Sequence, residues 1–549
     1  MTRIHIAAVL FPFVFLSKTI SQPADLYRAG FSSDTLQKHI FVLGNDSLEG
    51  RGMGSRGEET AANYIALQLQ SYGIQPVPSL GNYHQYFPVH GSKPLDASRL
   101  TVYSSNDTAV LRLQKDYVLY TVGAQTFIPS PVPLIFVGYG IVAPEYDYND
   151  YQNVNVQNAV VVFLSGEPRS NDVSYFGGNQ QTIYSSSALK QKTALARGAR
   201  GSILIQNPND RAQNTWEEEL PQFEFEEDRL LYSPSENLNV LINPAVVDRL
   251  FRHSAYAFTQ IIGFDSTASM KSFPLNITLT FDGKFFEREF LSSNVLGFIP
   301  GSDSVLKETY VLLSAHYDHL GIGPAVNGDS IYNGVYDNAA GVSSLLELAR
   351  IFSKERLSLK RSIIVAFLTG EERGFIGSQN YCINPPLPLY KTIADVNIDG
   401  ISMFEESKSF SGIGAELSSL GEILDSVAAM YHYSIEQPPD DYFRFNQFGK
   451  SDQFIFAQAG IPSILISEGL QYVSSSYEEG LERYIRWSSE IYHSPFDNLH
   501  QPMNFNAAIQ HTEFLYHFIA GLANQSTAPE WNRGVPFSQA RLRTIAEKK

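Results

Sequence analysis

The chain has 549 residues, with 40 Lys and Arg against 57 Asp and Glu, so its formal net charge is −17. With 43% hydrophobic and 18% charged residues, the composition excludes disorder for the bulk of the chain and is typical of a globular protein with a large core. The negative charge argues against nucleic acid or an anionic membrane as the main partner. Cys382 is the only cysteine, which excludes an internal disulfide and a cysteine-based zinc site. Any metal must therefore be held by histidines and carboxylates.

The first residues are typical of a secretory signal peptide. An apolar run over residues 6–16 follows a cationic start, precedes polar residues and is too short to span a bilayer. Thr19, Ile20 and Ser21 form a tolerable cleavage site, so residues 1–21 are predicted to be removed. No later segment reaches the length of a membrane helix. We therefore expect a soluble, exported protein, either periplasmic or secreted.

Two amphipathic helices are predicted within residues 33–75, each with one apolar face. The Gly-rich segment 49–54 between them lacks both a preceding strand and the ending of a phosphate-binding loop, so we interpret it as a flexible connection. Residues 130–284 contain short β-rich runs and one helix over 188–199. The acidic, aromatic stretch 216–227 is expected to be a surface loop. Residues 130–284 are therefore predicted to form a separate small module of mixed α/β type.

From residue 293 to about 523, apolar strands alternate with helices, of which 338–353 is the clearest. Four of the strands are largely apolar along their whole length, which suits a mainly parallel sheet covered by helices on both faces. They cover residues 310–314, 362–368, 394–398 and 463–467. In such sheets, functional residues gather in the loops at the carboxyl ends of the strands. The sequence therefore predicts a site at that edge.

The chain's most unusual residues fall in these predicted loops. Taken singly, each has an ordinary explanation such as a helix cap, a turn or a hydrogen-bonded histidine. Together they would crowd like charges at one edge of a sheet, and a pair of divalent cations removes that repulsion. Histidine and carboxylate are ligands that Zn²⁺ accepts. The residues are His316, Asp318, Asp337, Glu371, Glu372, Asp399 and His493.

Two local arrangements support metal-assisted hydrolysis. Glu371 and Glu372 are neighbours in a loop and point different ways, so one can bind metal while the other reaches a metal-bound water. Asp318 follows His316 by two residues and is suitably placed to hold the other ring nitrogen of that imidazole.

These motifs and their intervals resemble the co-catalytic dizinc exopeptidases related to bacterial leucyl aminopeptidase, aminopeptidase Y and glutamate carboxypeptidase II. The His316-x-Asp318 pair and the run from Asp337 to Gly341 carry much of the likeness. The segment 136–141 and the helix end at Gly198 resemble the protease-associated (PA) domain that is often inserted into members of this family.

The resemblance implies an α/β fold of the zinc exopeptidase, phosphorylase/hydrolase-like kind. Its mixed, mainly parallel sheet would be flanked by helices and interrupted by a small β-rich α/β PA domain. The implied divisions are a peptidase domain over 33–129 and 285–523, a PA domain over 130–284 and a C-terminal tail over 524–549.

The resemblance also implies two zinc ions per chain and a role for each site residue. Glu371 would be the general base, and Asp318 the second catalytic residue. A cis peptide bond is implied after the bridging aspartate. The implied ligands are Asp337 to both ions, His316 and Asp399 to one, and Glu372 and His493 to the other.

The sequence identifies the last histidine ligand and the oxyanion-stabilising group less directly than the other site residues. The interval from Asp399 to His493 exceeds the usual one, which leaves His432 and His500 as rivals. Only His493 lies in a Tyr-His-x-Pro-x-Asp context like that of the family. By position alone, the candidates for the oxyanion-stabilising residue are Tyr442 and Tyr472.

The resemblance implies an aminopeptidase that hydrolyses the N-terminal bond of peptides. Two related activities stay open: a glutaminyl cyclase with a single zinc, and a carboxypeptidase acting on acidic C-terminal residues. A non-catalytic binding protein like the transferrin receptor is a candidate from another class. Retention of His316 and Asp337 beside Asp399 favours two metals over the single zinc of a cyclase. The presence of Glu371 argues against a non-catalytic binding protein.

Overall fold

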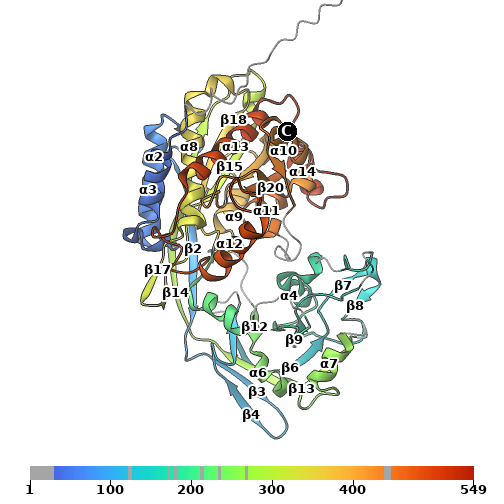
Figure 1. The fold of residues 1–549 in the computed structure, drawn as a ribbon. Coiled ribbons are helices and arrows are strands. Elements are labelled where there is room, and N and C mark those ends of the chain that lie inside the picture. The colour runs from blue at the N-terminus through green and yellow to red at the C-terminus, as the bar shows by residue number, and fades with distance from the viewer. Residues whose placement is uncertain are drawn as a thin grey trace, which may run out of the picture.

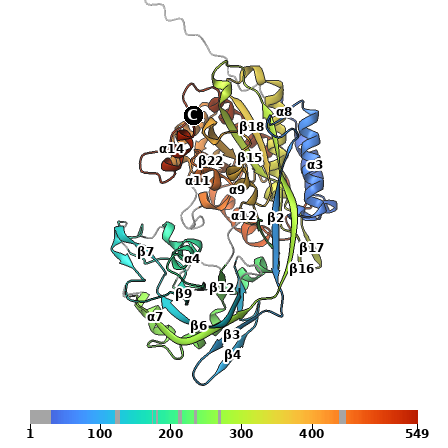
Figure 2. The same ribbon diagram turned by 180° about the vertical axis from the view of Figure 1, so that it is seen from behind.

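In the computed structural model, two β-sheets organise the chain, and the long strands β2 (His84–Pro94) and β14 (Phe285–Ile299) run from the body around one sheet toward the other (Figures 1 and 2). The predicted signal peptide and Tyr442 lie outside the described residues. The structure describes residues 30–548 apart from 121–126, 171, 173, 179–181, 210–214, 233–236, 266–269 and 438–446.

The larger sheet has ten strands, and its four central strands are parallel neighbours, buried throughout except for the last two residues of β22. They are, in spatial order, β18 (Ser362–Leu368), β15 (Tyr310–His316), β19 (Thr392–Asn397) and β22 (Ser463–Glu468). Antiparallel β14 and β20 (Ser409–Ile413) flank this centre, so the predicted mixed sheet is confirmed and its centre is parallel, whereas five of its nine strand pairings are antiparallel. The outer strands are β1 (Gln75–Pro76), β2, β11 (Glu227–Leu230) and β21 (Ser434–Ile435).

Alternate residues of the central strands enter two apolar cores, one on each face of the sheet. Val311 and Leu313 pack with the helices of one face, whereas Leu312 packs with those of the other. The first face is covered by α2 (Ser33–Leu43), α3 (Arg56–Ser71), α8 (Gly341–Lys354), α10 (Leu420–Met430) and α13 (Phe505–Asn524). The second core includes residues of α9 (Ile376–Ile383) and α11 (Gln453–Gln458). The remaining helices of this body are α12 (Tyr477–Glu490) and α14 (Ser538–Ala546).

The second sheet has eight strands in the order β4-β3-β13-β6-β9-β10-β12-β5. Residues of α4 (Ser187–Leu195) pack on one face, and residues of α6 (Pro244–Phe251) and α7 (Phe258–Asp265) on the other. Three of its strands precede residue 130, so the sheet draws on residues from both sides of that predicted boundary. The strands are β3 (Arg99–Tyr103), β4 (Thr108–Leu111), β5 (Tyr117–Leu119), β6 (Phe127–Val137), β9 (Val160–Leu164), β10 (Gly201–Ile205), β12 (Leu238–Ile242) and β13 (Ser272–Asp282).

The Gly-rich segment between α2 and α3 is not the flexible connection that the sequence suggested. It forms a 3₁₀ turn over Asp46–Arg51 that packs against the larger body. Gly50 has a φ of +65°, and a Cβ there would lie 2.2 Å from the main-chain oxygen of Tyr332. Gly52 forms an isolated bridge with His319. The glycines therefore permit a close approach of two main chains rather than motion.

The stretch 216–227 is also not the surface loop that its acidic composition suggested. Trp216 is buried and begins the short helix α5 (Trp216–Glu219). Phe225 is buried against Tyr332, with ring centroids 5.2 Å apart. The following strand β11 pairs with β2 at the edge of the larger sheet.

Two small hairpins complete the fold, β7 (Val142–Ala143) with β8 (Tyr148–Asn149) and β16 (Gly321–Val326) with β17 (Asp329–Tyr332).

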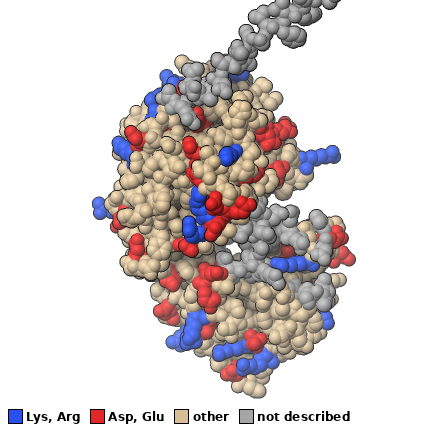
Figure 3. Space-filling model, in the orientation of Figure 1, with Lys and Arg blue, Asp and Glu red and all other residues tan. Residues whose placement is uncertain are grey.

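Acidic side chains are dispersed over the surface that Figure 3 shows, with basic and neutral groups between them. The net charge of −17 is therefore not concentrated in one acidic patch on that face. Among the residues described by the structure, no helix has the length and apolar character needed to cross a membrane.

Buried His511 on α13 is expected to make the free energy of unfolding sensitive to acid. Its Nδ1 accepts the Ser402 N–H at 2.9 Å, and burial lowers its pKa from 6.5 to about 4. A group whose pKa is lower in the folded state than in the unfolded state stabilises the fold. This contribution is complete at a pH above the unfolded-state pKa, and it is lost as the pH decreases toward the folded-state pKa. We expect the free energy of unfolding to decrease by about 3 kcal/mol between pH 6.5 and 4 through this residue. Denaturant titrations of wild type and His511→Gln over this range should diverge by that amount; parallel curves would refute the assignment.

Candidate metal centre

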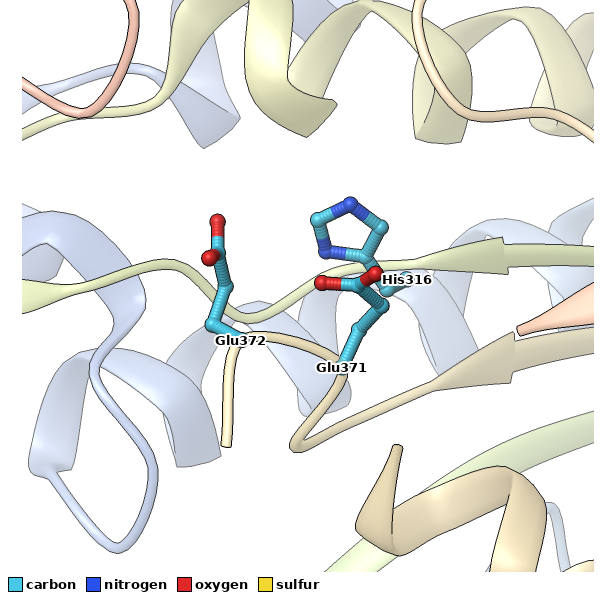
Figure 4. Close-up of side chains that lie close together, drawn as sticks. All are labelled: His316, Glu371 and Glu372. Atoms are coloured by element: carbon cyan, nitrogen blue, oxygen red, sulfur yellow. The ribbon is translucent and has the colours of Figure 1, made fainter. Parts of the chain in front are cut away.

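The carboxyl ends of three neighbouring parallel strands bring the predicted site residues to one edge of the larger sheet. His316 is the last residue of β15, Glu371 and Glu372 follow β18, and Asp399 follows β19. Figure 4 shows Glu371 and Glu372 leaving one turn with their carboxylates on the side where the His316 ring lies. The topology therefore produces the cluster that the strand pattern predicted.

Asp337 is supplied by an irregular turn over Val335–Ala340 that leads into α8. Its side chain does not cap that helix. Buried Asp497 holds the turn, because its two carboxylate oxygens accept the N–H groups of Tyr336 at 2.9 Å and Asp337 at 3.1 Å. The peptide bond between Asp337 and Asn338 is cis.

The two oxygens of Asp337 face two different groups of side chains. On one side, the His316 Nε2 lies 3.1 Å from Asp337 Oδ1 and 3.1 Å from Asp399 Oδ1. On the other side, the His493 Nε2 lies 3.2 Å from Asp337 Oδ2 and 3.1 Å from Glu372 Oε2. The five residues predicted as ligands thus form two clusters that share one carboxylate.

The structure brings His493, rather than its two rivals, to this centre. His493 adopts a left-handed conformation with φ of +54°, and its ring stacks on Tyr492 with centroids 3.8 Å apart. His432 and His500 form no ion pair with the ligand carboxylates among the described residues, whereas His493, which is also exposed, contacts two of them. The long interval between Asp399 and His493 is occupied in part by α10, α11, β22 and α12, which return the chain to the same edge.

The Asp318 carboxylate does not form the hydrogen bond to His316 that the sequence predicted. The nearest oxygen to His316 Nδ1 is the main-chain oxygen of Asp318 at 3.2 Å, whereas its carboxylate Oδ1 lies at 3.7 Å. That Oδ1 accepts the Glu371 N–H at 3.2 Å. The buried Asp318 carboxylate therefore supports the turn that carries Glu371 and reaches His316 only at ion-pair distance.

His319 belongs to the cluster but was assigned no role from the sequence. It is fully buried, and its Nδ1 lies 2.6 Å from Glu372 Oε1. His319, Asp337 and Glu372 together form a group with ligand atoms close enough to hold a metal ion. Its position three residues after His316 in the same strand-end loop is the signal that could have identified it.

The two adjacent glutamates have opposite electrostatic environments. Burial raises the pKa of Glu371 well above its usual range, and nearby Glu372 and Asp399 add to this against the opposing effect of His316. Burial also opposes ionisation of Glu372, but His493 and His319 outweigh it and hold the pKa of this carboxylate well below its usual range. The turn therefore presents one carboxyl group that favours a proton beside one that stays ionised.

The two tyrosines considered for the oxyanion have no demonstrated position at the centre. Tyr442 lies in the segment that the structure does not describe. Tyr472 is 2% exposed, and the Arg483 guanidinium lies 5.2 Å from the centre of its ring. The tyrosine that contacts a site residue is Tyr492, through its stacking on His493.

Comparisons with known proteins agree with this geometry. Residues 294–519 match the family described as Peptidase family M28. Over 141 residues, the chain is 31% identical to a probable zinc metalloprotease of Pyrenophora teres f. teres and 30% identical to one of Pyrenophora tritici-repentis. These alignments cover 26% of this chain and 25% and 27% of those proteins, so the chain spans about a quarter of the length of the curated relatives it matches.

The fold as a whole is similar to that of a solved aminopeptidase from Aneurinibacillus sp. strain AM-1. The two structures superpose with a TM-score of 0.51 at 18% sequence identity, over 92% of this chain and 95% of that one. At this level of identity, the similarity establishes the fold. It extends over nearly the whole chain, whereas the family match covers the part that carries the site residues.

Proposed function

We propose that the chain is a zinc-dependent aminopeptidase of peptidase family M28, the family whose model residues 294–519 match. It would hydrolyse the N-terminal peptide bond of peptides at the cluster centred on Asp337. The observation that carries the proposal is the division of the two Asp337 oxygens between two histidine–carboxylate groups. A carboxylate so placed can bridge two cations.

The side chains fit zinc in number and chemistry. His316 and Asp399 would hold one ion and Glu372 and His493 the other, with Asp337 shared, which gives each ion one imidazole and two carboxylates. Without cations, the three carboxylates would bring like charges together at one centre, and zinc ions would offset their mutual repulsion. Zinc bound there would polarise the scissile carbonyl and make water a better nucleophile.

The contrast between the adjacent glutamates supports separate roles for them. Two titratable groups whose environments push their pKa values apart are suited to different tasks in one reaction. Glu372 stays ionised and suits a metal ligand, whereas Glu371 favours a proton. We assign Glu371 as the group that takes a proton from the attacking water and delivers it to the leaving amine. The Asp318 carboxylate would hold the Glu371 turn in position by accepting the Glu371 N–H.

Within the described part of the chain, two arginines near the site, Arg51 and Arg373, favour recognition of an amino terminus over a carboxyl terminus. A carboxypeptidase needs a free basic group for the terminal carboxylate of its substrate. Arg51 donates its hydrogen bonds to main-chain carbonyls, and Arg373 donates to the Leu320 oxygen while stacking on Phe225. Both are therefore engaged by the protein itself. The carboxylates of the centre suit a protonated substrate amine.

A glutaminyl cyclase and a non-catalytic binding protein are less well supported by the site. A cyclase with one zinc would not need a carboxylate that presents one oxygen to each of two clusters. A non-catalytic binding protein would not need Glu371 to be held beside His316 and Glu372.

Hydrolysis assays on the zinc-loaded full chain test the proposal. Aminoacyl reporter substrates with a free α-amine should be cleaved, and the same substrates with an acylated amine should not. A chelator should abolish the activity, and zinc should restore it. Equal cleavage of the blocked substrate would refute aminopeptidase specificity, release of C-terminal residues from N-blocked peptides would establish the carboxypeptidase, and no cleavage of any substrate would refute the enzyme.

The short contact between His319 and Glu372 leads to a prediction about zinc affinity. His319 orients Glu372 through its Nδ1, so His319→Gln should weaken zinc binding by about 10- to 100-fold while zinc-saturated enzyme keeps most of its activity. Competition with a chromophoric chelator measures this. His39→Gln is the matched control, since His39 is equally buried but bonds Tyr64 and Tyr72. Equal zinc affinity in both variants would contradict the role given to His319.

We further propose that the chain is exported and that its second sheet belongs to an inserted PA domain. The apolar run at residues 6–16 supports export. The β-rich composition of the second sheet and the helix end at Gly198 support the PA assignment.

A further inference from the structure

Arg51 is a buried cation close to the carboxylates of the candidate metal centre. It ends the 3₁₀ turn between α2 and α3, has a φ of +53°, and is 1% exposed. A guanidinium is rarely buried to this extent unless its N–H groups are all paired.

The partners of Arg51 are four main-chain carbonyls from distant parts of the chain. Its Nε donates to the Tyr317 oxygen at 2.7 Å. Its Nη1 donates to the oxygens of Leu43 and Asn333, both at 2.6 Å, and its Nη2 donates to the Gly334 oxygen at 2.9 Å. The planar fork of the guanidinium therefore joins the end of α2 to two separate loops.

Those two loops carry proposed metal ligands. Tyr317 stands between His316 and Asp318, and Gly334 precedes Asp337 by three residues. The contact continues along the main chain, because the His319 N–H donates to the Arg51 oxygen at 3.3 Å. One side chain thus connects the loop that supplies His316 with the turn that supplies Asp337.

The charge of Arg51 also acts on the centre. Burial lowers its pKa to about 10, whereas Asp318, Asp497, Asp337 and Glu372 raise it, so the guanidinium stays protonated at neutral pH. The guanidinium therefore places a positive charge close to the carboxylates of Asp337 and Glu372. Arg51 acts on them through its charge, because its hydrogen bonds go to the four main-chain carbonyls.

We propose that Arg51 is a positioning residue that preorganises the proposed dizinc site by holding the His316 loop and the Asp337 turn at a fixed separation. This inference rests on the proposed function. It makes the segment between α2 and α3 part of the apparatus that positions the ligands. Ligands held in place before the metal arrives bind it more tightly, and a displaced ligand costs affinity.

The substitution Arg51→Lys tests the proposal, because lysine keeps the charge but lacks the planar fork. We expect zinc to bind at least about 10-fold more weakly and kcat at saturating zinc to fall by a similar factor, with KM within about twofold of wild type. Arg51→Met removes the charge as well and should have a larger effect on both quantities.

Arg361 provides the matched control. It is 3% exposed and donates to Thr309 and to the oxygens of Gln525 and Ser526, at the amino end of β18 and so at the end of that strand away from Glu371. Arg361→Lys should lower the Tm comparably to Arg51→Lys but leave zinc affinity and kcat unchanged. Loss of zinc affinity in proportion to Tm in both variants would reduce Arg51 to a purely structural role and overturn the proposal.

Zinc affinity and hydrolysis are measured separately, which distinguishes this inference from the proposed function. If wild type binds zinc but cleaves no peptide, the proposed function fails and the affinity comparison still decides the role of Arg51. If Arg51→Met does not fold, Arg51→Lys decides alone. Wild-type zinc affinity and kcat in Arg51→Lys would overturn the inference.

Discussion

The substitution Glu371→Gln is expected to lower kcat by about 10³-fold while leaving zinc bound. The amide matches the carboxylate in size but cannot accept and return a proton, and proton transfer of this kind contributes about 10² to 10⁴ in rate. Because Glu371 is not one of the proposed ligands, the zinc content should stay that of wild type. Steady-state kinetics on a free-amine substrate, together with elemental analysis of the same sample, gives both quantities.

Glu347→Gln is the control for this substitution. Glu347 is as buried as any residue of α8 and pairs with Arg350, so its loss tests the general effect of replacing a buried glutamate in the same domain. It should lower stability and leave kcat near the wild-type value. A Glu371→Gln enzyme that retained more than about a tenth of wild-type kcat would contradict the assignment of the base.

The substitution Asp337→Asn should remove the dizinc centre. An amide offers one oxygen and one NH₂ group, so it cannot present an anionic oxygen to each cluster. We expect the bound zinc to fall to one ion per chain or fewer at a free zinc concentration that saturates wild type, with no detectable hydrolysis. Equilibrium dialysis followed by elemental analysis measures the content.

Asp395→Asn provides a matched comparison within the same sheet. Asp395 is fully buried, burial raises the pKa of its carboxyl group well above the usual range, and its Oδ1 accepts from the Ser314 hydroxyl at 2.8 Å. Since burial already disfavours the charged form of that group, an amide should replace it with unchanged zinc content and activity. Retention of two zinc ions by Asp337→Asn would rule out the bridging role.

The central sheet could be predicted from the sequence because its strands carry the signal locally. Strands buried on both faces are largely apolar, so the runs around Val311 and Ile363 stand out without any knowledge of their neighbours. The site residues followed from the same pattern. His316, Glu371 and Asp399 each come within a few residues of a strand end, and parallel strands place those ends together.

The segments that were predicted wrongly are those whose structure depends on distant partners. The glycines of 49–54 are typical of a mobile linker, yet Gly50 approaches the Tyr332 main chain and Arg51 binds carbonyls from Tyr317 and Gly334. No local pattern encodes those contacts. The acidic stretch 216–227 is similar, since Phe225 is buried by Tyr332 rather than by its neighbours in sequence.

Residues that support the ligands were missed for the same reason. Asp497 lies four residues after His493, but its role depends on the N–H groups of Tyr336 and Asp337, which only the folded chain brings within reach. His319 contacts Glu372 across two strand-end loops. A ligand set can be inferred from residue type and spacing, whereas the groups that orient it are defined by tertiary contacts.

The most direct test of the dizinc centre is the number of zinc ions bound per chain. Purified full chain, stripped with a chelator and titrated with zinc, should bind two ions tightly, with hydrolysis of a free-amine substrate reaching its maximum only as the second site fills. A single tight site that supports full activity would contradict the shared role of Asp337, and no tight zinc binding would contradict the account as a whole.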